Sequence, residues 1–154
     1  MSNTLDLSNP ALELSFSPTQ LSIIQYSPKQ QIPPRLIALL TSQEPVPFFS
    51  FTRTPAEVSM IVPKSIVDEL YPPSSTQSPE SPIESSGPWL ALVVKGPMDL
   101  SLTGILHALT GPLKDAGVPV FASSTWDTDY VLINEGKREG AKKALSDAGW
   151  KFEQ

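Results

Sequence analysis

The chain has 154 residues, of which 40% are hydrophobic and 18% are charged, and its formal net charge is −5. A chain of this length can bury a core without disulfides and holds one domain or two small ones. The acidic balance argues against nucleic-acid binding, because contact with phosphates requires clustered lysine and arginine. The absence of cysteine excludes disulfides, thiolate nucleophiles and sulfur-bound metals.

The sequence also lacks the signals of membrane insertion and of catalysis. No apolar run reaches the roughly 20 residues of a membrane span, and the N-terminal residues lack the basic start and apolar core of a signal peptide. We therefore expect a cytoplasmic protein without a membrane partner. No glycine-rich phosphate loop follows a strand, and no histidine–carboxylate constellation or metal-ligand spacing occurs. We expect no enzymatic activity, no metal and no cofactor, and we interpret the one histidine, His107, as a surface or interface residue.

The first half of the chain alternates short apolar segments with proline-rich turns. Period-two alternation and β-branched or aromatic residues predict strands, whereas prolines at the start of two apolar segments predict short helices. The predicted elements are strands at 12–16 and 20–26, a helix at 32–40, strands at 48–53 and 57–62, and a helix at 63–70.

The segment 71–87 is dominated by proline and serine. It has too few apolar residues to offset the entropy of ordering, so we interpret it as a flexible linker. An alternative is a docking or phosphorylation motif, because Ser78 and Ser81 are each followed by proline.

The second half predicts a more regular pattern. A continuous apolar strand is followed by an amphipathic helix, two strands, a second helix and a short edge strand. These elements are expected at 89–94, 103–116, 119–125, 129–133, from 134 or 135 onward, and 150–152. The two halves together predict a duplicated split β-α-β plan, the ferredoxin-like α+β arrangement, with domains at 11–70 and 88–153.

Two junctions in the second half carry groups that suit a zwitterion. The helix start at 101–105 offers unpaired N–H groups to a carboxylate, with Ser101 placed to cap the helix and Gly104 leaving the backbone accessible. Asp129, at the start of a strand, can hold an ammonium group. Each residue also has a structural explanation: Asp127 and Asp129 can shape a β-turn, Trp126 can be a core anchor or dimer contact, and Gly104 can permit close packing.

The segments 104–121 and 124–133 resemble the ACT domains of the aspartokinase-like group, in particular those of the CASTOR-type cytosolic arginine sensors. The segment 48–62 is similar to the first ACT domain of those sensors. The resemblance covers roughly 12–152 apart from the linker, and it implies two tandem ACT domains with antiparallel sheets, helices on one face and an amino-acid-sensing function. The sensors carry four ACT domains and bind their ligand between the second and the fourth, so a two-domain chain would rebuild this surface as a homodimer.

The resemblance also implies which residues contact the ligand. Met98 and Asp99 match the loop that caps the ligand, and the residues at ligand-contacting positions are Gly104, Ile105, Thr125, Trp126, Thr128 and Asp129. The full set of candidate ligand-binding residues is Met98, Asp99, Leu100, Ser101, Leu102, Thr103, Gly104, Ile105, Thr125, Trp126, Asp127, Thr128 and Asp129. The resemblance favours arginine or lysine as the ligand, but Leu102 stands where the sensors have an acidic residue. This loss weakens the case for a strongly cationic ligand, although Asp99 or Asp127 could supply a carboxylate from nearby, so a neutral amino acid stays open.

Two functions follow from these expectations. The first is a non-enzymatic sensor, in which a bound amino acid changes the dimer or its outer surface and so its contact with a regulatory protein partner. The alternative is an adaptor, in which the ACT fold serves protein interaction and the ligand pocket is non-functional.

Overall fold

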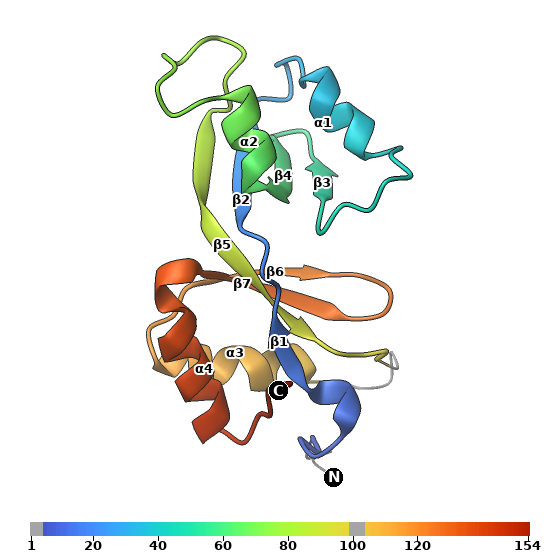
Figure 1. Ribbon diagram of the computed structural model, residues 1–154, viewed down its shortest axis with the longest axis vertical. Coiled ribbons are helices and arrows are strands. Elements are labelled where there is room, and N and C mark those ends of the chain that lie inside the picture. The colour runs from blue at the N-terminus through green and yellow to red at the C-terminus, as the bar shows by residue number, and fades with distance from the viewer. Residues whose placement is uncertain (1–4, 99–103) are drawn as a thin grey trace. The chain divides into compact units, whose positions relative to one another are not determined.

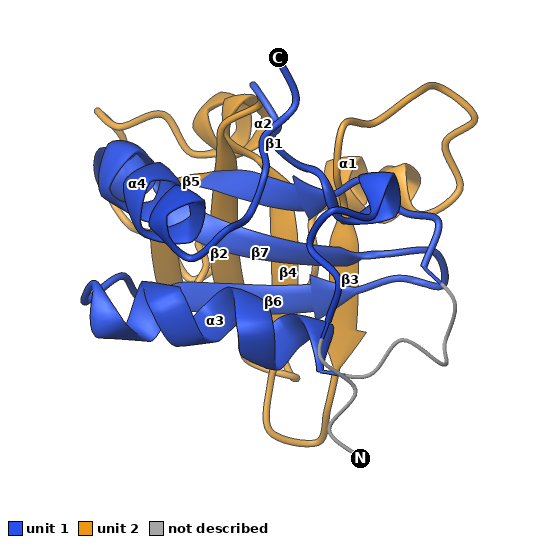
Figure 2. Cartoon of the chain, turned by 90° about the horizontal axis from the view of Figure 1, so that it is seen from below, with its two compact units in different colours: residues 1–18, 90–154 blue, residues 19–89 orange. Residues whose placement is uncertain are grey.

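The computed structural model describes residues 5–98 and 104–154. The chain forms two compact units: unit 1 comprises residues 1–18 and 90–154, and unit 2 comprises residues 19–89 (Figure 2). Each unit has a hydrophobic core of its own. These bounds differ from the expected domains, because the first predicted strand belongs to unit 1 and the expected linker 71–87 lies within unit 2.

Unit 2 is a complete ferredoxin-like βαββαβ fold (Figure 1). Its elements are β2 (Leu21–Tyr26), α1 (Pro34–Leu39), β3 (Ser50–Arg53), β4 (Val58–Pro63), α2 (Lys64–Leu70) and the first half of β5 (Glu84–Val94). The strand order is β3-β4-β2-β5, and the pairings are antiparallel. Apolar residues of both helices and of β2 and β4 fill the core, as the periodicity predicts, but Ile37 and Leu40, which the helical pattern places inward, are 43% and 52% exposed.

The proline- and serine-rich segment connects α2 to β5 rather than one domain to the other. The side-chain amide of Gln30 donates to the carbonyls of Pro79, at 3.0 Å, and Ser81, at 2.9 Å. The Tyr71 hydroxyl donates to the carbonyl of Glu80 at 3.1 Å. Strand β5 then begins at Glu84, inside the expected linker, and pairs with β2. Composition missed this strand because backbone pairing, and not apolar burial, orders its exposed first residues.

Unit 1 has the same plan, except that the strand beside β5 at the sheet edge comes from the N-terminal segment of the chain. Its elements are η1 (Pro10–Leu12), β1 (Leu14–Phe16), the second half of β5, α3 (Ile105–Asp115), β6 (Val120–Ser124), β7 (Asp129–Asn134), η2 (Glu135–Lys137) and α4 (Arg138–Asp147). The strand order is β1-β5-β7-β6. The core is formed by β1, β5, β7 and the inner sides of α3 and α4.

The N-terminal strand β1 occupies the sheet position expected for the C-terminal segment 150–152. It pairs antiparallel with β5, with Leu14 opposite Val94, while Phe152 makes only an isolated parallel bridge to Leu14. The Phe16 and Phe152 rings stack with their centroids 5.7 Å apart. The closing edge strand expected at 150–152 is therefore reduced to one bridge at Phe152 beside β1. The pairing of β1 with β5 was missed because a partner so distant in sequence cannot be identified from local periodicity.

The proline inside α3 is accommodated by a tryptophan beyond α4. Pro112 has no N–H, so the carbonyl of Ala108 lacks its usual helical partner. The indole N–H of Trp150 donates to this carbonyl at 3.3 Å, and the ring is almost fully buried. The tryptophan thus satisfies a backbone group that would otherwise cost free energy if left unpaired.

Candidate functional site

The loop after β5 and the turn between β6 and β7 are joined by direct hydrogen bonds in unit 1. The backbone N–H of Met98 donates to the carbonyl of Asp127 at 2.8 Å. The hydroxyl of Thr128 donates to the carbonyl of Val94, the last residue of β5. The structure therefore places Met98 beside the candidate turn, although the two segments are far apart in the sequence.

The turn itself is closed by its two threonines. The N–H of Thr125 donates to the carbonyl of Thr128 at 2.9 Å, and the N–H of Thr128 donates to the Thr125 hydroxyl at 3.4 Å. Such local side-chain bonds stabilise tight turns. Trp126 and Asp127 therefore form the tip, where Trp126 is 81% exposed. This exposure excludes the interpretation of Trp126 as a core anchor.

Thr128 and Ile105 have structural roles for their side chains. Thr128 is buried, and its hydroxyl is used to hold the turn to the end of β5. Ile105 is the first residue of α3, and its side chain belongs to the core of unit 1. The N–H and the carbonyl of Thr128 also bond to Thr125 within the turn. Of these two residues, only Ile105 can offer a ligand a backbone group, the N–H at the start of α3.

Asp129 lies at the start of β7, directly opposite Ser124 at the end of β6. The Ser124 hydroxyl donates to one carboxylate oxygen of Asp129 at 2.6 Å. A carboxylate has about four acceptor positions, so this bond orients the group and leaves capacity for a cation. Ser124 was not among the candidate residues, although its position at the strand end next to the turn could have indicated it.

The start of α3 is formed by a glycine in the left-handed region. Gly104 has φ +82° and is the N-cap of α3, the position that the sequence assigned to Ser101. A Cβ at Gly104 would meet no atom within 4 Å, so its conformation, and not close packing, favours glycine. Among the described residues, no side chain forms a capping hydrogen bond at this helix end. The predicted residues Asp99, Leu100, Ser101, Leu102 and Thr103 lie outside the described residues.

Gly96 is a further residue of this region that is not among the candidate residues. It has φ +65°, and a Cβ there would lie 3.0 Å from the carbonyl oxygen of Asp127. Its N–H donates to the carbonyl of Ala11, and the N–H of Lys95 donates to the carbonyl of Glu13, both at 2.9 Å. The loop after β5 is therefore held between the N-terminal segment and the candidate turn.

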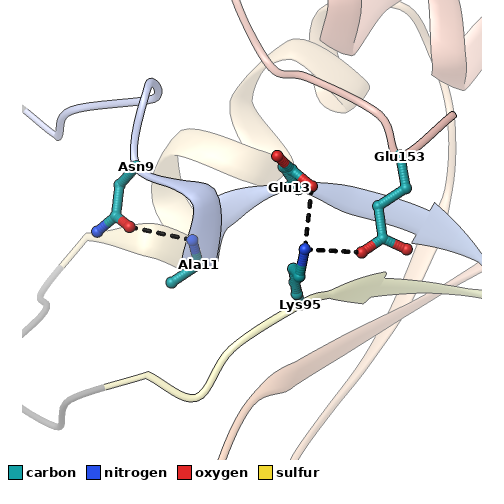
Figure 3. A network of polar contacts seen from close by, with 5 residues as sticks. All are labelled: Asn9, Ala11, Glu13, Lys95 and Glu153. Carbon is teal, nitrogen blue, oxygen red and sulfur yellow. Dashed lines mark hydrogen bonds and ion pairs between the residues drawn. The ribbon is translucent and has the colours of Figure 1, made fainter.

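Charged side chains reinforce the same loop from the other end of the chain. Lys95 forms ion pairs with Glu13 at 3.3 Å and Glu153 at 3.4 Å (Figure 3). The two carboxylates raise the pKa of the Lys95 ammonium above its usual value, with the hydrogen bond to Glu13 as the larger cause. The short helix η1 directly precedes Glu13. Asn9 caps this helix, because its side-chain oxygen accepts a hydrogen bond from the N–H of Ala11 at 3.0 Å (Figure 3).

Known proteins share this architecture. Residues 84–147 match the family model of the ACT domain. The human protein CASTOR3P is 35% identical over 104 residues, which cover 63% of this chain and 60% of that protein. Subunit 1 of the bovine cytosolic arginine sensor for mTORC1 is 31% identical over 93 residues, which cover 57% of this chain and 26% of that protein. The chain thus spans less than two thirds of the length of these curated relatives.

Solved structures extend the likeness to both units. A protein from Agrobacterium tumefaciens matches with a TM-score of 0.69 and 22% identity, covering 92% of this chain and 91% of its own. The regulatory subunit of aspartate kinase from Thermus flavus matches with a TM-score of 0.57 and 15% identity, covering 88% and 96%. The resemblance to ACT domains of the aspartokinase-like group and the α+β ACT-type fold class are therefore confirmed.

The segment that matches the ACT-domain model contains the described part of the candidate site. It includes Gly96, Gly104 and the turn 125–128, whereas β1 and Trp150, which complete the fold, lie outside it. A cavity of about 360 Å³ in the same unit is lined by His107, Lys114 and Val120, among others, and by none of the candidate residues that the structure describes. Among the described residues, no helix is long and apolar enough to cross a membrane.

Proposed function

We propose that this chain is a non-enzymatic regulatory module that binds a free amino acid between the start of α3 and the turn at 125–129 of its ACT domain. The observation that carries the proposal is the bond between the Met98 N–H and the Asp127 carbonyl. It ties the loop that leads to the helix start to the turn that bears the carboxylate of Asp129. Donors for an anion and an acceptor for a cation thus belong to one connected part of unit 1.

The chemistry of an α-amino acid suits these groups. The N–H groups at the start of α3, after Gly104, would bind the carboxylate of the ligand, because the first N–H groups of a helix have no partner within it. Asp129, oriented by Ser124, would bind the ammonium group. The exposed ring of Trp126 would cover the aliphatic or cationic part of the ligand, and Met98 and Asp99 would cap it.

Arginine is the first ligand to test, since the bovine relative is named as an arginine sensor. Lysine follows, and neutral amino acids remain candidates because Leu102 brings no carboxylate. We further propose that the chain acts in the cytoplasm as a homodimer, with the ligand at the interface of two ACT domains. Ligand binding would then change the contact with a regulatory protein.

Thermal unfolding and calorimetry of the purified chain with individual amino acids test the proposal. At a ligand concentration of a hundred times Kd, binding should stabilise the fold by about 2.7 kcal/mol. Sedimentation with and without the ligand measures the dimer. If no amino acid shifts the unfolding temperature or gives a binding heat, the chain is not a sensor of this kind.

A pair of matched variants separates the site from general charge effects. Asp129→Asn should abolish binding, because the amide cannot replace the anion. Asp115→Asn removes the same charge from the exposed last residue of α3, and it should leave binding unchanged. Equal affinity in both variants would show that Asp129 is not the ammonium partner.

The alternative function is an adaptor that binds a protein through the same surface. The 81% exposure of Trp126 favours it, because exposed aromatic rings often supply much of the binding energy at protein interfaces. An adaptor would retain its partner in pull-down experiments with or without amino acids, whereas the partner of a sensor would be released or captured by ligand.

A further inference from the structure

Two serines in the loop between α2 and β5 are followed by proline, and the structure distinguishes them. Ser78 is exposed, whereas Ser81 is half-buried. The Ser81 hydroxyl oxygen accepts from the N–H of Ser78 at 3.0 Å, and its carbonyl accepts from Gln30. The contacts of the Ser78 hydroxyl are longer, 3.3 Å from the N–H of Glu80 and 3.4 Å from the Ser81 hydroxyl. The sequence motif is the same, but Ser78 is the more accessible of the two.

We propose that Ser78 is a phosphorylation site for a proline-directed serine/threonine kinase. Such kinases require a proline directly after the acceptor, and Pro79 provides it. In the reaction, the Ser78 oxygen would form a bond to the γ-phosphorus of ATP as the bond to the leaving ADP breaks, and the hydroxyl proton would pass to the catalytic aspartate of the kinase. This inference is independent of amino-acid binding.

The contacts of the loop give this site a built-in control. Three successive carbonyls, those of residues 79, 80 and 81, accept hydrogen bonds from the side chains of Gln30 and Tyr71. The Tyr71 hydroxyl also bonds to that of Tyr26 in the core of unit 2 at 2.9 Å. The segment has to leave these partners to enter a kinase cleft. Local opening of an exposed segment costs little free energy, so Gln30 and Tyr71 set how often Ser78 is presented.

Phosphorylation would in turn favour the open loop. A phosphoserine carries a charge of about −1.5 to −2, and here it would lie in a turn shared with the carboxylate of Glu80. The neutral contact between the Ser78 and Ser81 hydroxyls would be lost, and like charges would repel. The phosphate would therefore weaken the turn that Gln30 holds against the rest of unit 2.

The experiment uses the full chain, ATP and a proline-directed serine/threonine kinase, with the phosphorylated residues located by mass spectrometry. We expect phosphate on Ser78 and its loss in Ser78→Ala. Ser75→Ala is the matched control, because Ser75 is exposed in the same loop but is followed by Thr76, and it should leave incorporation unchanged. No incorporation, or phosphate on Ser81 in preference to Ser78, would overturn the proposal.

A second pair of variants tests the role of the loop contacts. Gln30→Ala removes two hydrogen bonds to the loop, so it should raise the initial rate by at least about fivefold, which corresponds to the loss of one typical net hydrogen bond. Gln31→Ala changes the neighbouring residue and should leave the rate unchanged, and circular dichroism checks that both variants are folded. An equal rate in Gln30→Ala and the parent chain would contradict the proposed control of Ser78.

Discussion

The two units contain the same hairpin turn, and only one of them carries side chains suited to a ligand. Thr54 begins the turn between β3 and β4, and Thr125 begins the turn between β6 and β7. In each, the threonine N–H donates to the carbonyl three residues later, Glu57 or Thr128, at 2.9 Å. Each threonine hydroxyl also accepts from the N–H of that fourth residue, at 3.2 Å and 3.4 Å respectively. The backbone solution is shared, so the difference lies in the other side chains.

The residues at the tips of these turns differ in chemistry. In unit 2 they are Pro55 and Ala56, which offer no charge and little surface, and in unit 1 they are Trp126 and Asp127. The fourth residue reaches a neighbouring strand in both units. Glu57 accepts a hydrogen bond from the side chain of Gln25 on β2, whereas Thr128 donates to the β5 backbone. One scaffold thus supports a plain turn and a turn suited to binding.

The helix starts differ in the same direction. In α1 the N-cap is Pro33 and the first helical residue is Pro34, and proline has no N–H to offer an anion. In α3 the corresponding residues are Gly104 and Ile105, which retain their donors. A shared fold therefore does not imply a shared function: the capacity to bind a zwitterion depends on a few residues at one end of unit 1.

The largest effect is expected from Gly96→Ala, which acts on the loop that distinguishes unit 1. Alanine at φ +65° is strained, and its Cβ would lie 3.0 Å from the Asp127 carbonyl. We expect a loss of about 2–3 kcal/mol in the free energy of unfolding, together with weaker ligand binding. Urea unfolding measures the first effect and calorimetry the second.

Gly111→Ala is the control for that substitution. Gly111 lies inside α3, where a Cβ would meet no atom within 4 Å, so alanine should stabilise the chain by about 0.5–1 kcal/mol. If Gly96→Ala and Gly111→Ala changed the free energy of unfolding in the same direction, the close approach of Gly96 to the turn would not explain the effect of Gly96→Ala.

Much of the fold could be predicted from the sequence because its signals are local. The apolar run at 89–94 and the apolar spacing around Leu109 correspond to the central part of β5 and to α3. The turn at 125–128 was also correctly placed, because it separates two clear strands. These features depend on residues that are close neighbours in the chain.

The errors concern partners that are far apart in the sequence. Nothing local indicates that β1 pairs with β5, that Trp150 serves the carbonyl of Ala108, or that Gln30 holds the loop at 79–81. The buried role of Thr128 was missed for the same reason, because its acceptor is Val94. The role of the candidate residues as ligand contacts stays a prediction.

Thr128→Val tests whether the two turns depend equally on their fourth residue. Valine keeps the shape of threonine but leaves the carbonyl of Val94 without this donor, so we expect a loss of about 1–2 kcal/mol in the free energy of unfolding. Thr128→Ser retains the hydroxyl and should lose less. In unit 2, Glu57→Gln can still accept from Gln25 and should cost under about 0.5 kcal/mol. A larger effect in unit 2, measured by urea unfolding, would reverse the proposed ranking.

We expect unit 2 to lose stability at alkaline pH because of a tyrosine in its core. Unit 2 buries Tyr26, and burial, with the hydrogen bond to Tyr71 as a second cause, raises the pKa of its hydroxyl above the usual value. The unfolded chain releases this proton near pH 10, so the neutral form stabilises the fold below that pH and its contribution falls as the pH rises further. Tyr26→Phe should cost about 1 kcal/mol at pH 7 and should flatten this alkaline decline. If the free energies of unfolding of the parent chain and of Tyr26→Phe fell in parallel above pH 10, ionisation of Tyr26 would not explain the alkaline decline.

The smallest effect is expected where a surface charge joins distant segments of unit 1. Lys95→Met removes the ion pairs with Glu13 and Glu153, which link β1 and the C-terminal segment to the end of β5. Lys143→Met removes a local pair with Asp147 on α4. The pKa of each lysine is raised by its acidic partners, so each ion pair contributes to stability below the usual lysine pKa and its contribution is lost as the pH rises above that value.

Both substitutions should lower the unfolding temperature slightly at low salt, and the difference from the parent chain should shrink as added salt screens exposed charges. Lys95→Met should show the larger change, because it also loosens the loop that leads to α3, and it alone should weaken amino-acid binding. If Lys95→Met and Lys143→Met had the same effect on the unfolding temperature and on amino-acid binding, the pairing of β1 with β5 would hold the loop without help from Lys95.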